Sequence, residues 1–260
     1  MKLKLSVVFI FLFGLTSLRA SNLYIVSGGF NSCGQGAAND HRAAKTSEMY
    51  RVFKQRVKLQ KGDDYIFTCF NGNGFRFFGK KKGLKSGGYG VRTLNSRSKG
   101  REAFMFLERT QQYFINFIKR SYSYKRFYKN IIVIGHSHGT NLGINYLKNV
   151  THLSSNTYLF TIDPISQKYC KFRNVLASRL KGLVPLSENC RRFPPEFDIH
   201  FQSKVITNTS SWVNYFQKDC AFLSSGPAAH PKVENYNICS RDHRGIKKDH
   251  QIWDRVLRIR

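Results

Sequence analysis

The sequence predicts an α/β fold in which a mostly parallel sheet is flanked by helices. An all-apolar run at 131–134 and a largely apolar run at 158–162 have the length and composition of buried strands. A segment with helical spacing of its apolar residues, at 140–149, lies between them. Strands that alternate with helices in this way are typical of parallel α/β sheets.

The other elements follow from shorter patterns along the chain. Weaker strands are expected at 204–207 and 233–238, and a closing amphipathic helix is expected around Trp253. The remaining expected elements are strands at 23–26 and 65–69 and helices at 42–57 and 101–119.

One segment, at 75–100, fits neither a helix nor a strand. Glycine, lysine, arginine and aromatic residues alternate there without a regular period, so we expect a long basic loop. A solvated loop, a lid over a substrate and a nucleic-acid tract are the three interpretations, although no folded nucleic-acid motif accompanies it.

The chain has 260 residues, of which 41% are hydrophobic and 14% aromatic. This composition excludes a disordered protein, and the length fits one domain over 21–260. Residues 1–20 are typical of a secretory signal, because Lys2 and Lys4 precede an apolar run that ends near a small residue, Ala20. The run is shorter than the roughly 20 apolar residues of a membrane span, so we expect a secreted, periplasmic or extracellular protein.

Six cysteines and a strong positive charge complete the composition. No cysteines form a Cys-x-x-Cys pair, and in an exported protein an even number favours disulfide bonds over buried free thiols. The formal net charge of +28 favours an anionic partner, such as a membrane surface or a cell-wall polymer, over specific nucleic acid. Charge that serves solubility alone is the alternative.

The chemistry is concentrated in the motif Gly-His-Ser-His-Gly at 135–139. It follows the buried strand at 131–134 and precedes the helix at 140–149, which is the context that a sharp turn exposing a nucleophilic serine requires. We therefore predict that Ser137 is a nucleophile. His136 and His138 flank it, but no third ligand lies nearby in the sequence, so no metal site is expected.

The segment Ile-Val-Ile-Gly-His-Ser-His-Gly resembles the nucleophile elbow of the lipase and esterase branch of the α/β-hydrolases, in which serine, acid and histidine follow in that order. The resemblance implies Asp163 as the acid, because it ends the next strand and precedes Pro164, as in pancreatic-type lipases. In other members the acid follows one strand later; near Asn208 no carboxylate occurs before Asp219, and Asp198 and Asp219 remain alternatives.

The resemblance also implies the base and the oxyanion hole. His243 begins a His-x-x-Ile pattern, and an aspartate and a short Trp-containing helix follow this pattern. The other candidates, His200, His230 and His250, do not begin such a pattern. The backbone N–H groups of His138 and Phe30 are the implied oxyanion donors. The segment Gly28-Gly-Phe30 resembles the His-Gly-x segment of lipases, with Gly28 in the place of histidine.

The predicted activity is hydrolysis of a carboxylic ester by a lipase, phospholipase or esterase, through an acyl-enzyme and without a cofactor. Two alternatives remain open. The same site could belong to a thioesterase, an amidase or an acyltransferase, or the chain could be a non-catalytic basic protein that binds anionic polymers.

Overall fold

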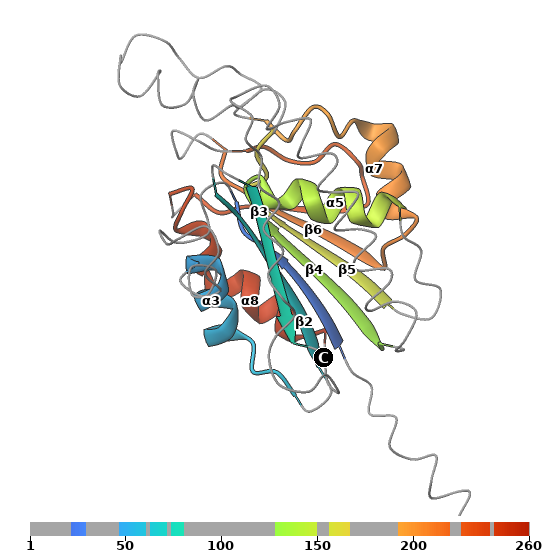
Figure 1. The fold of residues 1–260 in the computed structure, drawn as a ribbon. Helices are drawn as coiled ribbons and strands as arrows, with labels where there is room; N and C mark the ends of the chain where they lie inside the picture. Colours follow the sequence, from blue (N-terminus) through green and yellow to red (C-terminus); the bar gives the residue numbers. More distant parts are fainter. Residues whose placement is uncertain are drawn as a thin grey trace, which may run out of the picture.

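A seven-stranded sheet forms the centre of the computed structural model (Figure 1). Its strand order is β3-β2-β1-β4-β5-β6-β7, and every neighbouring pair is parallel except β2 with β3. The strands are β1 (Asn22–Ser27), β2 (Asp64–Asn71), β3 (Gly74–Lys80), β4 (Asn130–His136), β5 (Asn156–Ile162), β6 (Ser211–Phe216) and β7 (Val233–Asn237). The structure describes residues 22–29, 47–60, 63–71, 74–80, 128–149, 156–166, 192–218, 225–239 and 242–259.

Helices cover both faces of the sheet (Figure 1). On one face lie α5 (Gly139–Asn149) and α7 (Ile199–Ile206); on the other lie α3 (Glu48–Arg56) and α8 (His250–Leu257), with a short 3-10 helix, η3 (Ile246–Lys248), just before α8. The predicted fold class, α/β with a mostly parallel sheet and flanking helices, is confirmed.

The core has two halves, because successive side chains of a strand point to opposite faces of the sheet. In β4, Ile131 and Val133 pack with α5 and α7, whereas Ile132 and Ile134 pack with α3 and α8. All seven residues of β4 are buried, which explains why its residues 131–134 are apolar without alternation.

The weak strand expected at 204–207 is wrong, because these residues lie at the end of helix α7. The helix begins after Asp198, whose side chain accepts a hydrogen bond from the backbone N–H of Phe201 at 2.8 Å, a normal N-terminal cap. The strand follows instead as β6. Asn214 interrupts the apolar pattern of β6, but its side chain is buried and hydrogen-bonded to Thr161 and Asn235.

The prediction of a loop at 75–100 is wrong for its first residues, because Gly74–Lys80 forms β3. β3 pairs antiparallel to β2, with Asn71 opposite Gly74 and Phe67 opposite Phe78. Aromatic residues favour strands, and this preference prevails over the glycines and basic residues among them.

Several predictions fall outside the described residues. These are the signal at 1–20, the rest of the basic loop at 81–100, the helix at 101–119 and Phe30. Cys239 forms a disulfide bond, and no free cysteine occurs in the described ranges. In the same ranges, no helix is long and apolar enough to cross a bilayer.

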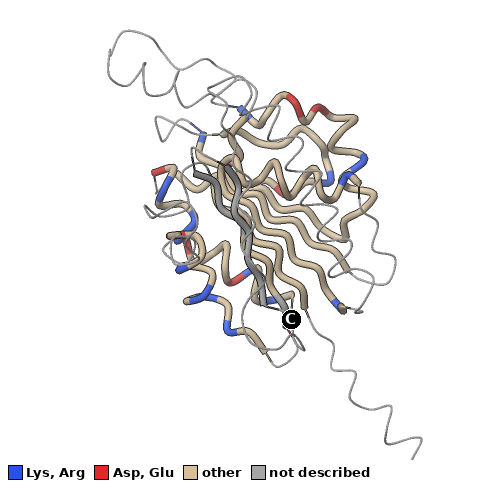
Figure 2. Tube along the Cα trace, in the orientation of Figure 1, with Lys and Arg blue, Asp and Glu red and all other residues tan. Residues whose placement is uncertain are grey.

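Charged residues surround the sheet but do not enter its middle (Figure 2). Strands β1, β4, β5 and β6 contain no lysine or arginine, and the blue segments of Figure 2 lie on the surrounding helices and connections. The carboxyl ends of these uncharged strands are where the predicted site residues lie.

Candidate active site

Ser137 lies at the turn between β4 and α5, in the left-handed conformation with φ of 56°. Its backbone N–H donates to the carbonyl of Ile162 at 2.9 Å, which ties the turn to the neighbouring strand β5. The first backbone contact of the helix follows at once, from the N–H of Thr140 to the carbonyl of Ser137 at 3.1 Å. This strand–turn–helix arrangement is the one that the motif predicts.

The glycines of the motif are required by close backbone approach. A Cβ atom on Gly135 would lie 2.5 Å from the Cα of Thr140, and one on Gly139 would lie 2.4 Å from the carbonyl oxygen of Gly28. Gly29 packs against the nucleophile itself, because a Cβ atom added to Gly29 would lie 2.6 Å from the Cβ of Ser137. The loop after β1 therefore touches the elbow directly.

Two strained residues occur at this edge of the sheet, Ser137 and Asp163, whose φ is 45°. A non-glycine residue in such a conformation costs about 1–3 kcal/mol. Full burial of one isoleucine or valine side chain contributes about as much, and β4 alone buries several. The strands that precede the two residues therefore outweigh the strain.

The structure brings together the three predicted catalytic side chains. The Nε2 atom of His243 lies 3.0 Å from the Oγ of Ser137, and its Nδ1 atom lies 2.7 Å from the Oδ2 of Asp163. Ser137 is 4% exposed, the side chain of His243 16%, and Asp163 is fully buried. Because a carboxylate only accepts, the Nδ1 of His243 donates to Asp163, and Nε2 then accepts from the hydroxyl of Ser137.

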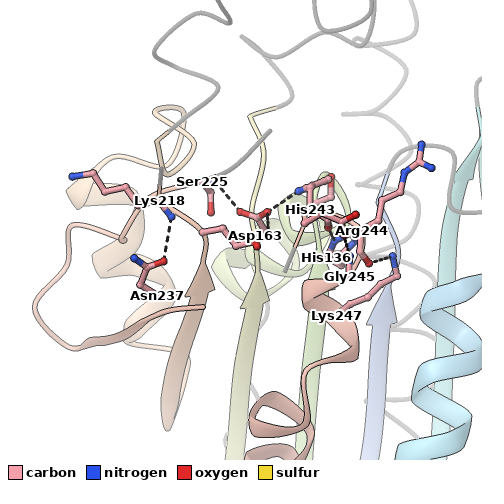
Figure 3. Close-up of polar contacts among 12 residues, drawn as sticks. His136, Asp163, Lys218, Ser225, Asn237, His243, Arg244, Gly245 and Lys247 are labelled. Carbon is pink, nitrogen blue, oxygen red and sulfur yellow. Dashed lines mark hydrogen bonds and ion pairs between the residues drawn. The ribbon is translucent and has the colours of Figure 1, made fainter. Parts of the chain in front are cut away.

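Asp163 follows β5 and is held by three donors (Figure 3). Its Oδ1 accepts from the backbone N–H of Ser225 at 2.8 Å, and its Oδ2 accepts from the Nε2 of Gln217 at 3.1 Å as well as from His243. A buried carboxylate is stable only when its oxygens are satisfied, and these bonds satisfy both of them.

Gln217 occupies the position that follows the strand after β5, where the resemblance stated for the sequence placed the alternative acid. The sequence placed that position near Asn208, because 204–207 was expected to be the strand. In the structure the strand is β6, and the residue that follows it is Gln217. Its amide supports Asp163 from the end of the next strand. The sequence offered no signal for this role, because β6 itself was not predicted.

The alternative acids and bases that the structure describes lie away from Ser137. Asp198 caps α7 through its side chain, and Asp219 is outside the described residues. Three other histidines follow Asp163. His200 lies at an exposed position of α7, His230 lies in the loop before β7, and His250, which is 66% exposed, lies at the start of α8.

The two predicted oxyanion donors can be placed only in part. His138 directly follows the nucleophile, and its carbonyl accepts from the N–H of Asn141 at 3.2 Å as α5 begins. Phe30 lies outside the described residues, but Gly28 and Gly29, which precede it, contact the elbow as described above.

Contacts that the sequence did not reveal hold the loop that carries His243 (Figure 3). The Nε2 of His136 lies 2.8 Å from the carbonyl oxygen of His243, and the Nζ of Lys247 donates to the carbonyl of Arg244 at 2.6 Å. Trp253 of α8 donates from its Nε1 to the carbonyl of Lys247 at 2.7 Å. The elbow residue before the nucleophile thus contacts the base directly, a long-range pairing that only the fold reveals.

Charges beneath this loop are paired across the molecule. Lys247 and Lys248 both contact Glu48, the first residue of α3, at 2.9 and 2.6 Å. Burial lowers the pKa of Lys247, and the hydrogen bond that Lys247 donates to Glu48 opposes that effect. Burial would raise the pKa of Glu48, but hydrogen bonds from Lys248 and Lys247 outweigh burial and lower the pKa to about 2.

This ion pair predicts a pH-dependent stability. The pKa of Glu48 is below its ordinary value of 4.5, so its contribution is present above pH 4.5 and is lost as the pH falls toward 2. We expect Glu48→Gln to lower the melting temperature at pH 7, and we expect the difference from wild type to shrink steadily between pH 4.5 and 2. Circular dichroism melts across this range measure the difference. Asp254→Asn, which removes an exposed carboxylate of α8, is the control; a Glu48→Gln difference that stays constant with pH would contradict the prediction.

Comparisons with known proteins place the chain only loosely. No family model matches the chain, and no curated protein matches it. Among solved structures, the chain is similar to the esterase Pf2001 of Pyrococcus furiosus, with 17% sequence identity and a TM-score of 0.45, over 91% of this chain and 79% of that one. A similarity of this degree does not assign a reaction to this chain.

Proposed function

We propose that the chain is a serine hydrolase that cleaves carboxylic esters. The supporting observation is the continuous hydrogen-bonded series from Ser137 through His243 to Asp163, at 3.0 and 2.7 Å, on a strained strand-to-helix turn. A nucleophile, a base in contact with it and a buried carboxylate that orients the base are the parts that acyl transfer to serine requires.

The proposed reaction has two halves. As the Oγ of Ser137 attacks the ester carbonyl, its proton passes to the Nε2 of His243, and the oxyanion accepts hydrogen bonds from the backbone N–H groups of His138 and Phe30. The alkoxide leaves with the proton from His243, which gives an acyl-enzyme. Water then attacks the acyl carbon, transfers a proton to His243 and releases the carboxylic acid, while Ser137 regains its proton.

Asp163 has a defined part in both halves. The carboxylate keeps the proton of His243 on Nδ1 in the resting state and stabilises the imidazolium that forms in each step. Its place after β5, the strand next to the nucleophile strand β4, supports the proposed resemblance to pancreatic-type lipases. The proposed family is therefore the lipase and esterase branch of the α/β-hydrolases.

Labelling with a fluorophosphonate probe tests the proposal, because such a probe reacts with an activated serine. We expect labelling of the wild-type protein and none of Ser137→Ala. Hydrolysis of p-nitrophenyl esters of increasing chain length and of phospholipids then identifies the ester. Absence of labelling in a folded wild-type protein would contradict the proposal, and turnover of a thioester or an amide in preference to every ester would change the assigned reaction.

The substrate is proposed to lie at an anionic surface outside the cell. The supporting observations are the signal-like segment at 1–20 and the net charge of +28. A lipase or phospholipase that acts on a lipid with an anionic head group fits both. The partner proposed for the surface is thus an anionic membrane or a cell-wall polymer.

This charge predicts salt-sensitive membrane binding. We expect the protein without residues 1–20 to sediment with anionic vesicles more than with neutral ones in low salt, and less so as salt shortens the Debye length to roughly 10 Å at 0.1 M. Each basic residue near such a surface contributes about 1 kcal/mol, so changing Lys81, Lys82 and Lys85 to glutamate should weaken binding by about 100-fold or more.

A variant with an equal charge change separates local from overall charge. Glutamate at the exposed residues Arg51 and Lys54 of α3 and at Lys58, just after α3, changes the net charge by the same amount, and we expect a smaller loss of binding from it. Equal binding of wild type to anionic and neutral vesicles in low salt would contradict the membrane-surface proposal.

A further inference from the structure

We propose that His136 is a positioning residue that sets the distance between the nucleophile and the base, an inference that rests on the proposed function. His136 is adjacent to Ser137 in the chain and is hydrogen-bonded to the backbone of His243 in space. One side chain thus connects the backbone of the nucleophile to the backbone of the base, although His136 and His243 are 107 positions apart in the sequence.

The hydrogen bond between the two histidines has a defined direction. A carbonyl oxygen can only accept, so the Nε2 of His136 donates to the carbonyl of His243, over 2.8 Å. His136 is 6% exposed, and the two rings lie side by side, with centroids 5.0 Å apart and planes inclined by 31° (Figure 3). The ring of His136 therefore packs against the ring of His243 and donates to its backbone at the same time.

The surroundings of His136 keep its ring neutral. Burial lowers the pKa of His136 well below its ordinary value, and the positive charge of Lys247 acts in the same direction. In the neutral ring a single nitrogen carries a proton, and the bond to His243 requires that this nitrogen is Nε2. His136 therefore donates one hydrogen bond, from its Nε2 to the carbonyl of His243.

The bond fixes His243 at the point where the geometry of the site is most sensitive. The ring of His243 must reach Ser137 with one nitrogen and Asp163 with the other, so a shift of its backbone lengthens one contact or both. A misplacement of about 1 Å can lower a rate by about 100-fold. Lys247 holds the next carbonyl, that of Arg244, so His136 supplies the tie nearest to the base.

Two variants separate the hydrogen bond from the packing of the ring. His136→Phe keeps a ring and removes the donor, whereas His136→Gln places an amide N–H near the position of Nε2. We expect His136→Phe to lower kcat by about 10- to 100-fold with little change in KM, since the residue touches the base and not the substrate. We expect His136→Gln to recover most of kcat. His250→Gln, at a 66% exposed histidine, is the matched control.

The measurements are kcat and KM for a p-nitrophenyl ester, the rate of labelling by a fluorophosphonate and the melting temperature of each variant. The inference is overturned if folded His136→Phe labels as fast as wild type, or if His136→Gln is as slow as His136→Phe. If His136→Phe does not fold, His136→Met, which also lacks the donor, replaces it in the comparison. Failure of the proposed function is distinguishable, because the wild-type protein would then neither label nor hydrolyse the ester.

Discussion

Replacement of Ser137 by alanine is expected to lower kcat/KM for an activated ester by about 10⁴-fold or more, with the fold retained. Removing the nucleophile of a triad leaves only the rate that binding and the oxyanion hole provide. Alanine keeps the Cβ that packs on Gly29 and loses only the Oγ that contacts His243. Ester hydrolysis by the purified variant, with a circular dichroism melt, measures both parts of the prediction.

A second serine variant provides the control for this experiment. Ser47→Ala removes another buried hydroxyl, at the start of α3 and without a hydrogen-bond partner among the described residues. We expect Ser47→Ala to retain wild-type activity. If Ser137→Ala keeps more than about a tenth of the wild-type rate, Ser137 is not the nucleophile, whatever the geometry around it.

The elbow could be predicted because its requirements are local in the sequence. A buried strand, two glycines, a serine and a helix lie within twenty residues, and the structure places Ser137 on that turn. Asp163 and His243 were predicted from a resemblance, and the structure brings both to Ser137. The position of Asp163 beside the elbow follows from parallel strand order, because the ends of β4 and β5 lie next to each other. His243 comes from the segment between β7 and η3, which the strand order alone does not place.

The parts that sequence reasoning missed depend on contacts between distant segments. β6 was not predicted because Asn214 interrupts its apolar pattern; in the structure Asn214 is buried among polar partners from β5 and β7. Because β6 was not predicted, nothing in the sequence indicated that Gln217 lies beside Asp163. The bond from His136 to His243 likewise has no signature in sequence, since it depends on where the loop before α8 lies against the elbow.

The start of the basic loop was mispredicted for a different reason. Residues 74–80 contain phenylalanines together with glycine, lysine and arginine, so their apolar positions follow neither the helical nor the strand period. The decision for a strand comes from the partner β2, which offers a free edge at the end of the parallel series. Pairing with an existing strand satisfies backbone groups that a loop would leave to water.

Asp163→Asn is expected to lower kcat by about 10⁴-fold and also to reduce stability. Asp163 accepts from Ser225 at one oxygen and from Gln217 and His243 at the other, so all of its partners are donors. An asparagine has one oxygen and one NH₂ group, and each orientation places that NH₂ against another donor. If it faces His243, the proton of His243 moves to Nε2, which can then no longer accept from Ser137.

The opposite orientation of the asparagine is also unfavourable. With its oxygen toward His243, the NH₂ group meets the backbone N–H of Ser225 in a fully buried position, which costs about 1–3 kcal/mol for an unsatisfied donor. The expected loss of activity therefore comes with a lower melting temperature, and single-turnover kinetics on an activated ester separate slow chemistry from partial unfolding.

Asp198→Asn is the matched control, because asparagine caps a helix about as well as aspartate does and Asp198 serves only as the cap of α7 among its described contacts. We expect it to retain full activity. Asp219→Asn tests the other expected position of the acid. A large loss in Asp219→Asn, together with an active Asp163→Asn, would move the acid to the end of β6; the three donors on Asp163 would then be structural, and the orientation of His243 would depend on a different carboxylate.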